Sequence, residues 1–427
     1  SLNGLIAQFQ AEHPDIIVEV QSPQGFRGQL DLAAMAAEYD CFQASPALND
    51  ETLAAIVSVE PFLAADTSVR KDDFFASILE QFVYQGQLWG LPGNVSVNVV
   101  NYNKDLFDAA GLAYPTPSWT TSDFLELAVA LTQGSGEDEQ YGYVPSFSEA
   151  NDLVSILDRL GAELLDDAED PPRLDFVAPS VVDAFRWYTS LVTQYHVQPV
   201  LDQEGGDPGA SARDRQALID EGRAGMWLDG GTGMAFMGGR GFAVRIEGGP
   251  GAPAEGNQGV VPLPAGSNSA QGSGFQSADG YFISAQSDAR QACWTWISFL
   301  TQHPTSTSEL PARRSVAESA EYRQLAGEER AEAFLASVES GSRPSFYQRI
   351  SDEGDWLAFS SLWLSNAYER VVGGEATVEE ALADAQEAAD DYRDCIIAND
   401  GFQDPEVMRT CLGEADGMNA MPGMPVP

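Results

Sequence analysis

Apolar residues along this chain follow two alternating patterns, one with the spacing of a helix and one with the unbroken run of a buried strand. Leu2, Leu5 and Phe9 share one face of a helix. The run from Ile16 to Val20 that follows is rich in β-branched residues, as strands are. Because helices and short strands continue to alternate, we predict an α/β fold with parallel sheets flanked by helices.

The same two patterns place the remaining elements. Helices are predicted over 30–35, 53–57, 74–82, 153–160, 181–195, 217–221, 292–300, 330–338, 356–371 and 378–397. Strands are predicted at 16–20, 41–42, 95–100, 226–227, 243–246, 260–261 and 280–285. Residues 248–274 are rich in Gly, Pro, Ser and Asn, which is typical of surface loops.

The most informative segment runs from Leu88 to Thr132 and joins a turn, a strand and two helices. Gly90 marks the turn, Gly111 is the expected stop of the first helix, and Thr120 begins the cap of the second. The segment contains no arrangement of nucleophile, base or metal ligand. We therefore interpret it as part of a binding site.

Polar residues interrupt the strand of this segment at Asn94, Ser96 and Asn98. A strand that emerges from a core and carries amides and a hydroxyl at that point can present hydrogen-bonding groups to a solute. We expect at least one of the three side chains to meet ligand and the others to satisfy the backbone of the turn.

These residues resemble the extracellular solute-binding proteins of family 1, the carbohydrate-binding receptors of ABC importers. The family pattern is a Tyr-Gly-x-Pro turn, a strand that ends in Tyr-Asn-Lys-Asp, then Gly-Leu, a pair of prolines and Trp-Thr. This chain has Trp89 in place of the first Tyr and keeps the rest up to Thr120. Other blocks that resemble the family follow in family order, at 5–18, 225–231, 280–285, 310–316 and 373–382. The family's first strand and loop have no counterpart before Ser1, which leaves that part of the resemblance open.

The resemblance implies a two-lobed periplasmic-binding-protein fold (type II, maltose-binding-like), each lobe a mixed, mostly parallel sheet flanked by helices. The predicted first lobe is 1–103 plus 280–325, and the second is 104–279 plus 326–427. The implied function is an extracytoplasmic receptor, periplasmic or lipid-anchored at the cell surface. Such a receptor captures a sugar or oligosaccharide by hinged closure of its lobes and delivers it to a membrane permease. It acts as a monomer, without cofactor or catalytic residue.

Aromatic platforms and planar polar groups are the side chains that a sugar site needs. Trp356 lies near where the related receptors carry a stacking aromatic, and the alternative for it is a core tryptophan. Trp363 is a similar candidate on a more apolar face. Phe275 and Gln276 precede the return crossing at 280–285 and are further candidates.

Five other positions complete the predicted site. Asp229, Gly230 and Gly231 end the strand at 226–227, where glycines permit a close approach of backbone to ligand. Arg313 is expected to bind ligand hydroxyls or a carboxylate, with a surface ion pair as the alternative. Ser45 follows the strand at 41–42, and its alternative is an ordinary turn serine.

The net charge of the chain restricts the classes of molecule that it can bind. With 65 Asp and Glu against 22 Lys and Arg, the formal net charge is −43. Such a field repels nucleic acid and anionic membranes and tolerates neutral or cationic ligands. We expect no nucleic-acid partner, and attribute the acidity to surface solubility or to adaptation to salt or acid.

The four cysteines are spaced too far apart for a zinc or redox motif, and no metal site is predicted. Cys395 and Cys411 flank a polar loop and are expected to bridge in an exported protein. Cys41 and Cys293 are expected to be small buried apolar residues, with a second bridge left open.

Two alternative functions stay open, one with another ligand and one of another class. A receptor of the same fold for a polyamine or other cation is favoured by the acidity. A secreted glycoside hydrolase also needs aromatics and a pair of carboxylates, although no hydrolase or cofactor motif is found.

Overall fold

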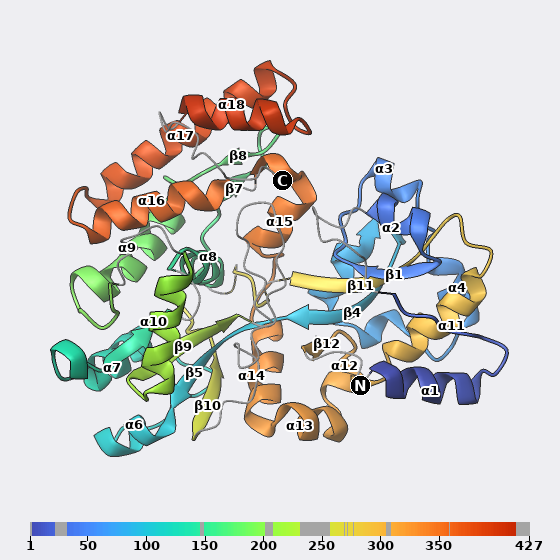
Figure 1. Cartoon of the computed structure of the whole chain (residues 1–427), viewed down its shortest axis with the longest axis horizontal. Coiled ribbons are helices and arrows are strands. Elements are labelled where there is room, and N and C mark those ends of the chain that lie inside the picture. The colour runs from blue at the N-terminus through green and yellow to red at the C-terminus, as the bar shows by residue number, and fades with distance from the viewer. Residues whose placement is uncertain are drawn as a thin grey trace.

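The computed structural model describes residues 2–21, 32–145, 149–200, 208–230, 257–268, 270, 272–275, 277–304, 309–357 and 359–415. Two groups of helices, each around a sheet, form two lobes (Figure 1). Each lobe has its own large cluster of buried apolar side chains. No helix in the described ranges is both long and apolar enough to cross a bilayer.

The first lobe is built on a sheet with the strand order β1-β11-β4-β12. Its core includes Phe9, Phe82, Phe282 and Trp294, all nearly inaccessible to solvent. The strands are β1 (Cys41–Ala44), β4 (Leu91–Ser96), β11 (Ser277–Ile283) and β12 (Leu310–Pro311), with a hairpin of β2 (Val83–Tyr84) and β3 (Gln87–Leu88). The helices are α1 (Leu2–Glu12), α2 (Leu32–Glu38), α3 (Asp50–Leu53), α4 (Glu60–Ala65), α5 (Ala76–Leu79), α11 (Arg290–Leu300), α12 (Arg314–Ala317), α13 (Ala320–Ala326) and α14 (Glu328–Glu339).

The second lobe is built on a sheet with the order β10-β5-β9-β6. The strands are β5 (Asn98–Asn103), β6 (Tyr141–Val144), β9 (Ala224–Gly230) and β10 (Gln258–Pro262), with a hairpin of β7 (Leu165–Asp166) and β8 (Arg173–Leu174). The helices are α6 (Lys104–Ala110), α7 (Thr121–Leu131), α8 (Glu149–Arg159), α9 (Pro179–Thr193), α10 (Pro208–Asp220), α15 (Phe346–Glu353), α16 (Ser360–Val372), α17 (Val378–Ala398) and α18 (Pro405–Ala415).

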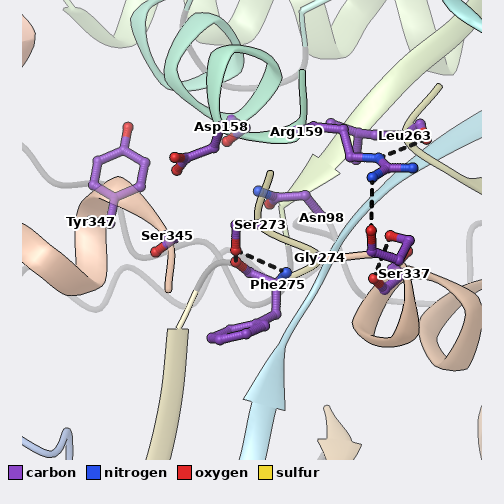
Figure 2. A pocket seen from close by; sticks show the side chains of 12 residues that line it. Asn98, Asp158, Arg159, Leu263, Ser273, Gly274, Phe275, Ser337, Ser345 and Tyr347 are labelled. Atoms are coloured by element: carbon purple, nitrogen blue, oxygen red, sulfur yellow. Dashed lines mark hydrogen bonds between the residues drawn. The ribbon is translucent and has the colours of Figure 1, made fainter. Parts of the chain in front are cut away.

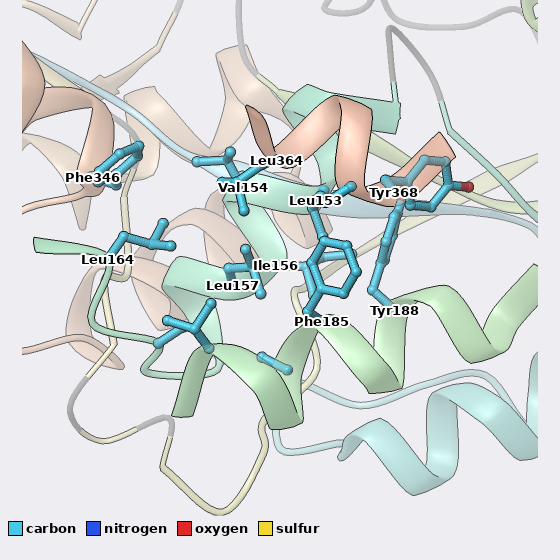
Figure 3. Close-up of a cluster of buried hydrophobic side chains, with 14 of the residues drawn as sticks. Leu153, Val154, Ile156, Leu157, Leu164, Phe185, Tyr188, Phe346, Leu364 and Tyr368 are labelled. Atoms are coloured by element: carbon cyan, nitrogen blue, oxygen red, sulfur yellow. The ribbon is translucent and has the colours of Figure 1, made fainter. Parts of the chain in front are cut away.

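Helix α8 runs through the middle of the second core (Figure 3). Leu153 and Leu157 are fully buried and point toward α9 and α16, where Phe185 and Leu364 meet them. Burial of each large apolar side chain contributes about 1.5–3 kcal/mol. The spacing of Ser155 and Asp158 places both on another face of α8, which is buried as well. A polar helix face that is buried needs partners, and these partners form the candidate site described below.

Local sequence signals fix several element ends. Thr120 caps α7 in a capping box, in which its hydroxyl accepts from the Asp123 N–H and the Asp123 carboxylate accepts from the Thr120 N–H. Gly111 ends α6 in the left-handed conformation, with a φ of 68°. Both ends lie where the sequence predicts them.

Within its described residues the chain passes between the lobes three times. The first crossing is the nearly continuous ribbon of β4 and β5, with only Val97 between them. The second leads into β11, and the third joins α14 to α15. The buried side chains of α14 belong to the first cluster, whereas our predicted division placed 326–427 in the second lobe. The residue limits of the lobes stay a prediction.

The expectation of mostly parallel sheets is wrong for the described strands. Only β6 and β9 pair in parallel within the two four-stranded sheets. The crossings explain this result. Strand β11 brings the chain back to the first lobe, so it runs opposite to β4. The last residue of β9, Gly230, pairs with the first residue of β5, Asn98, so these two strands also run in opposite directions.

Other predicted elements differ from the structure. Residues 16–20 belong to no strand in the described chain, and Ile17 is 77% exposed. The helix predicted over 74–82 is limited to α5, between two 3-10 turns. Helix α16 begins at Ser360, after a separate turn at Asp355–Leu357. The predicted strand at 243–246 lies outside the described residues.

All four cysteines are bridged. Cys395 pairs with Cys411 and joins α17 to α18, as expected. Cys41 pairs with Cys293 and joins β1 to α11, with 5.8 Å between their Cα atoms. The expectation of two unbridged apolar cysteines is therefore wrong, because the fold brings together residues separated by 252 positions.

Candidate functional site

A pocket lies where the two lobes meet (Figure 2). Leu263 of the second core and Phe275 of the first core both line it. It encloses about 360 Å³ of empty space, part of which is open to solvent. The lining is otherwise polar, with five serines and the side chains of Asn98, Asp158, Arg159 and Tyr347.

The β4–β5 ribbon leads polar side chains toward this pocket. Asn94, Ser96 and Asn98 alternate along the ribbon, so strand geometry places them on one face. The Asn94 amide and the Ser96 hydroxyl both donate to the carboxylate of Glu309, the latter at 2.8 Å. Asn94 also accepts from Gln43 at 2.7 Å. The first two of these predicted site residues are therefore held by protein partners, and Asn98 alone lines the pocket.

Ser45 belongs to the same polar face of the first sheet. Its hydroxyl donates to the carboxylate of Asp279 at 2.6 Å. Burial raises the pKa of Asp279, the bond from Ser45 lowers it, and the negative charge of Glu309 raises it. Two carboxylates thus lie near each other at this end of the first lobe.

Asp158 joins the second lobe to the third crossing. Its carboxylate accepts from the Phe346 N–H at 2.8 Å, at the beginning of α15, and lies 3.6 Å from the guanidinium of Arg343. Burial raises its pKa to about 6, although Arg343, the Phe346 N–H and Arg349 oppose the change. Asp158 therefore positions α15, which carries Tyr347 into the pocket lining.

Tyr347 and Asp158 approach the same space in Figure 2. Burial raises the pKa of Tyr347 well above its ordinary value, and the charges of Asp158 and Asp152 raise it further. The phenol is therefore neutral at physiological pH, and it can both donate and accept a hydrogen bond.

The second and third crossings touch through glycines. A Cβ atom on Gly341 would lie 2.0 Å from the backbone nitrogen of Gly274, and one on Gly274 would lie 2.0 Å from the carbonyl oxygen of Ser337. Neither position has room for a side chain. The two crossings consequently form one closely packed pair at the edge of the pocket.

The tryptophans that we predicted as site residues lie in the second core. Trp356 is 3% exposed, packs edge-on against Phe402 and donates its indole N–H to the Glu353 carbonyl at 3.2 Å. Trp363 is 4% exposed and packs against Tyr392. This packing supports the core alternative for both residues, and neither lines the pocket between the lobes.

Arg313 is buried within the first lobe. It donates to Asp73 at 2.9 Å and to the Ser68 carbonyl at 3.0 Å. Burial opposes ionisation of Asp73, but bonds from Ser315 and Arg313 bring its pKa below the ordinary value. The structure therefore favours the ion-pair alternative for Arg313, although the pair is buried rather than on the surface.

The remaining predicted residues have mixed outcomes. Phe275 lines the pocket with a ring that is 4% exposed. Asp229 and Gly230 lie in β9 opposite Val99 and Asn98. Gly231 and Gln276 lie outside the described residues, and ligand contact stays a prediction for all five residues.

Sequence reasoning missed Asp158, Glu309, Asp279 and Tyr347. Asp158 carried a recognisable signal, because Asp152, Ser155 and Asp158 recur at every third position and so lie on one face of α8. Glu309 and Asp279 gave no such signal, since strand pairing brings them to their partners from distant parts of the sequence.

Comparison with known proteins gives a consistent result. A model of the bacterial extracellular solute-binding protein family matches residues 1–305. The mannitol-binding protein of Pseudomonas aeruginosa is 26% identical over 243 residues, which cover 54% of this chain and 51% of that protein. The chain spans about half the length of the curated relatives it matches.

Solved structures share the fold. The sugar-binding protein MalE of Xanthomonas citri has a TM-score of 0.68 at 22% identity, covering 91% of this chain and 93% of that one. A solute-binding protein of an ABC transporter from Agrobacterium vitis, with bound D-mannitol, has a TM-score of 0.60 at 19% identity, covering 94% and 96%. These likenesses confirm the predicted two-lobed fold.

Proposed function

The chain belongs to the bacterial extracellular solute-binding protein family, and from this premise we propose that it is the receptor of an ABC importer for a sugar or sugar alcohol. The observation that carries the proposal is the polar pocket between two separately packed cores. The similarity to a mannitol-binding protein and to structures named for sugars and polyols supports this class of ligand.

The mechanism is capture by closure. A ligand that contacts both lobes has a greater affinity for the closed arrangement, so binding shifts the population toward it. The crossings are the segments that can absorb such a hinge motion. A permease then reads the relative angle of the lobes and receives the solute. No bond in the solute is made or broken, and the receptor acts as a monomer.

The disulfides support an extracytoplasmic location, periplasmic or at the cell surface. Such bridges persist in oxidising compartments and are rare in the cytosol. The bridge between Cys41 and Cys293 links β1 to α11 within the first lobe, and the one between Cys395 and Cys411 lies in the second. Each bridge therefore lies within one lobe, and no disulfide restrains movement between the lobes.

Titration calorimetry with D-mannitol, ribitol, maltose and spermidine tests the proposal. We expect saturable binding of at least one polyol or sugar, and chromatography of the recovered solute to show it unchanged. Scattering measured with and without the bound solute should show a smaller radius of gyration in its presence. Absence of binding to all three hydroxylated compounds, or release of cleaved maltose, contradicts the proposed function.

A further inference from the structure

Asn98 differs from the other polar residues of its ribbon. Its side-chain oxygen is buried, and no donor among the described residues reaches it. Asn94 and Ser96, four and two positions earlier on the same face, are held by Glu309. Asn98 instead lines the pocket, and Figure 2 shows its side chain extending toward the open space near Asp158.

An acceptor that is buried without a donor is costly, because it has given up water and gained nothing in return. Serine hydroxyls of the pocket do not supply the missing donor. Ser337 donates to the Ala333 carbonyl at 2.8 Å, and Ser340 donates to the Ser337 carbonyl at 2.6 Å. With their protons used in this way, both hydroxyl oxygens remain as acceptors on the pocket wall. The pocket is therefore rich in acceptors and suits a ligand rich in donors.

Charge decides between the two donor-rich ligand classes. Although the whole chain has a formal net charge of −43, Asp158 is the only carboxylate among the described lining residues. Arg343 lies 3.6 Å from it, and Arg159 lines the same pocket. These two guanidinium groups offset the carboxylate, so the local charge does not favour an ammonium group. Neutral hydroxyls remain as the suitable donors.

The position of the large aromatic side chains limits the ligand further. The indoles of Trp356 and Trp363 are packed in the core and offer no stacking surface here. Each ring of an oligosaccharide has a face that suits an aromatic platform, whereas a linear polyol has none. A small polyol therefore suits this lining better than an oligosaccharide.

We propose that Asn98 is the specificity-determining residue of this pocket, and that its side-chain oxygen accepts a hydrogen bond from a hydroxyl group of a small neutral polyol. This inference rests on the proposed function, because it assigns a ligand class and a contact to the same site.

The test compares the wild type with Asn98→Ala in calorimetry with D-mannitol, maltose and spermidine. We expect D-mannitol to bind more tightly than the other two compounds. Loss of one hydrogen bond should weaken D-mannitol binding to Asn98→Ala about tenfold. The melting temperature of the free variant should be unchanged or higher, because the substitution removes an acceptor that had no partner.

Asn103→Ala is the matched control. Asn103 lies on the same strand and caps α6, where it accepts from the Asp105 N–H at 3.1 Å. It does not line the pocket. Loss of this cap should lower the melting temperature while leaving D-mannitol affinity unchanged. Asn98→Ala should therefore lose affinity without losing stability, and Asn103→Ala should lose stability without losing affinity.

A second measurement identifies the contact itself. Monodeoxy analogues of mannitol each lack one hydroxyl, and one of them should bind the wild type about tenfold more weakly than D-mannitol does. Asn98→Ala should bind that analogue and D-mannitol equally, since the two deletions remove the same hydrogen bond.

The outcomes separate the two proposals. If the wild type binds D-mannitol and Asn98→Ala binds it within about twofold, the oxygen meets no ligand hydroxyl, and this inference fails while the proposed function stands. Tighter binding of spermidine or maltose than of D-mannitol overturns the ligand class. Failure of the wild type to bind any hydroxylated compound overturns both.

Discussion

Asp158→Asn should change the stability of the protein in a way that depends on pH. The asparagine keeps an oxygen to accept the Phe346 N–H but removes a buried negative charge and its ion pair with Arg343. Loss of the ion pair with Arg343 lowers the free energy of unfolding at any pH at which Asp158 is ionised in the wild type. The informative quantity is therefore the change with pH in the difference between the two proteins' free energies of unfolding.

The magnitude follows from the pKa of Asp158, which burial raises from 3.8 to about 6. The folded state then holds the proton more tightly than the unfolded state. The resulting stability is present in full below pH 3.8 and is lost as the pH rises through about 6. At about 1.4 kcal/mol per pKa unit, the whole effect is about 3 kcal/mol. Between about pH 4 and about pH 7.5, the variant should gain about 2 kcal/mol or more relative to the wild type.

Urea unfolding monitored by tryptophan fluorescence at a series of pH values measures this difference. Asp123→Asn is the control, because hydrogen bonds from Thr120 lower the pKa of that exposed carboxyl. Its stabilisation is present above the ordinary pKa of 3.8 and is lost as the pH falls, so its replacement should give a change of opposite sign. A difference between Asp158→Asn and wild type that stays flat, or moves against the variant toward neutral pH, would refute the reasoning and show that Arg343 outweighs burial.

Two further predictions concern the cores. Trp356→Ala should destabilise the second lobe by about 3–5 kcal/mol and leave solute affinity nearly unchanged, which thermal unfolding and calorimetry can show together; a large loss of affinity with an unchanged melting temperature would instead support stacking on ligand. Replacement of Cys41 and Cys293 by alanine should lower stability by up to about 5 kcal/mol, against about 3 kcal/mol for Cys395 and Cys411, because the first bridge closes a far longer loop. Mass spectrometry of unreduced peptides checks the pairing, and an equal loss for the two bridges would contradict the loop-length argument.

The sequence predicts those features that depend on neighbouring residues. The cap at Thr120, the helix stop at Gly111 and the β-branched strand through Val99 all follow from local chemistry, and the structure has them. The resemblance to a known family supplied the two-lobed arrangement, which the comparisons confirm. Periodicity alone did not give it.

Features that depend on distant residues were harder to predict. The antiparallel pairing of β4 and β11 follows from the return of the chain between lobes, and no residue pattern within either strand encodes it. Burial of Trp356 results from contact with Phe402, which lies beyond two helices in the sequence. Asn98 was a candidate from its polar position in a strand, but only the structure separates it from Asn94, which already has partners.

The contact between Gly274 and Gly341 has a practical consequence for engineering this protein. The backbones of the two crossings are in direct contact there, with no side chain between them. A reporter domain or a linker inserted at either glycine would therefore force the second and third crossings apart. The turn at Gly373 and Gly374, between α16 and α17, is exposed and far from the crossings in sequence. Exposed turns of this kind tolerate insertion best, so a circular permutation opened there should preserve the ability of the molecule to flex.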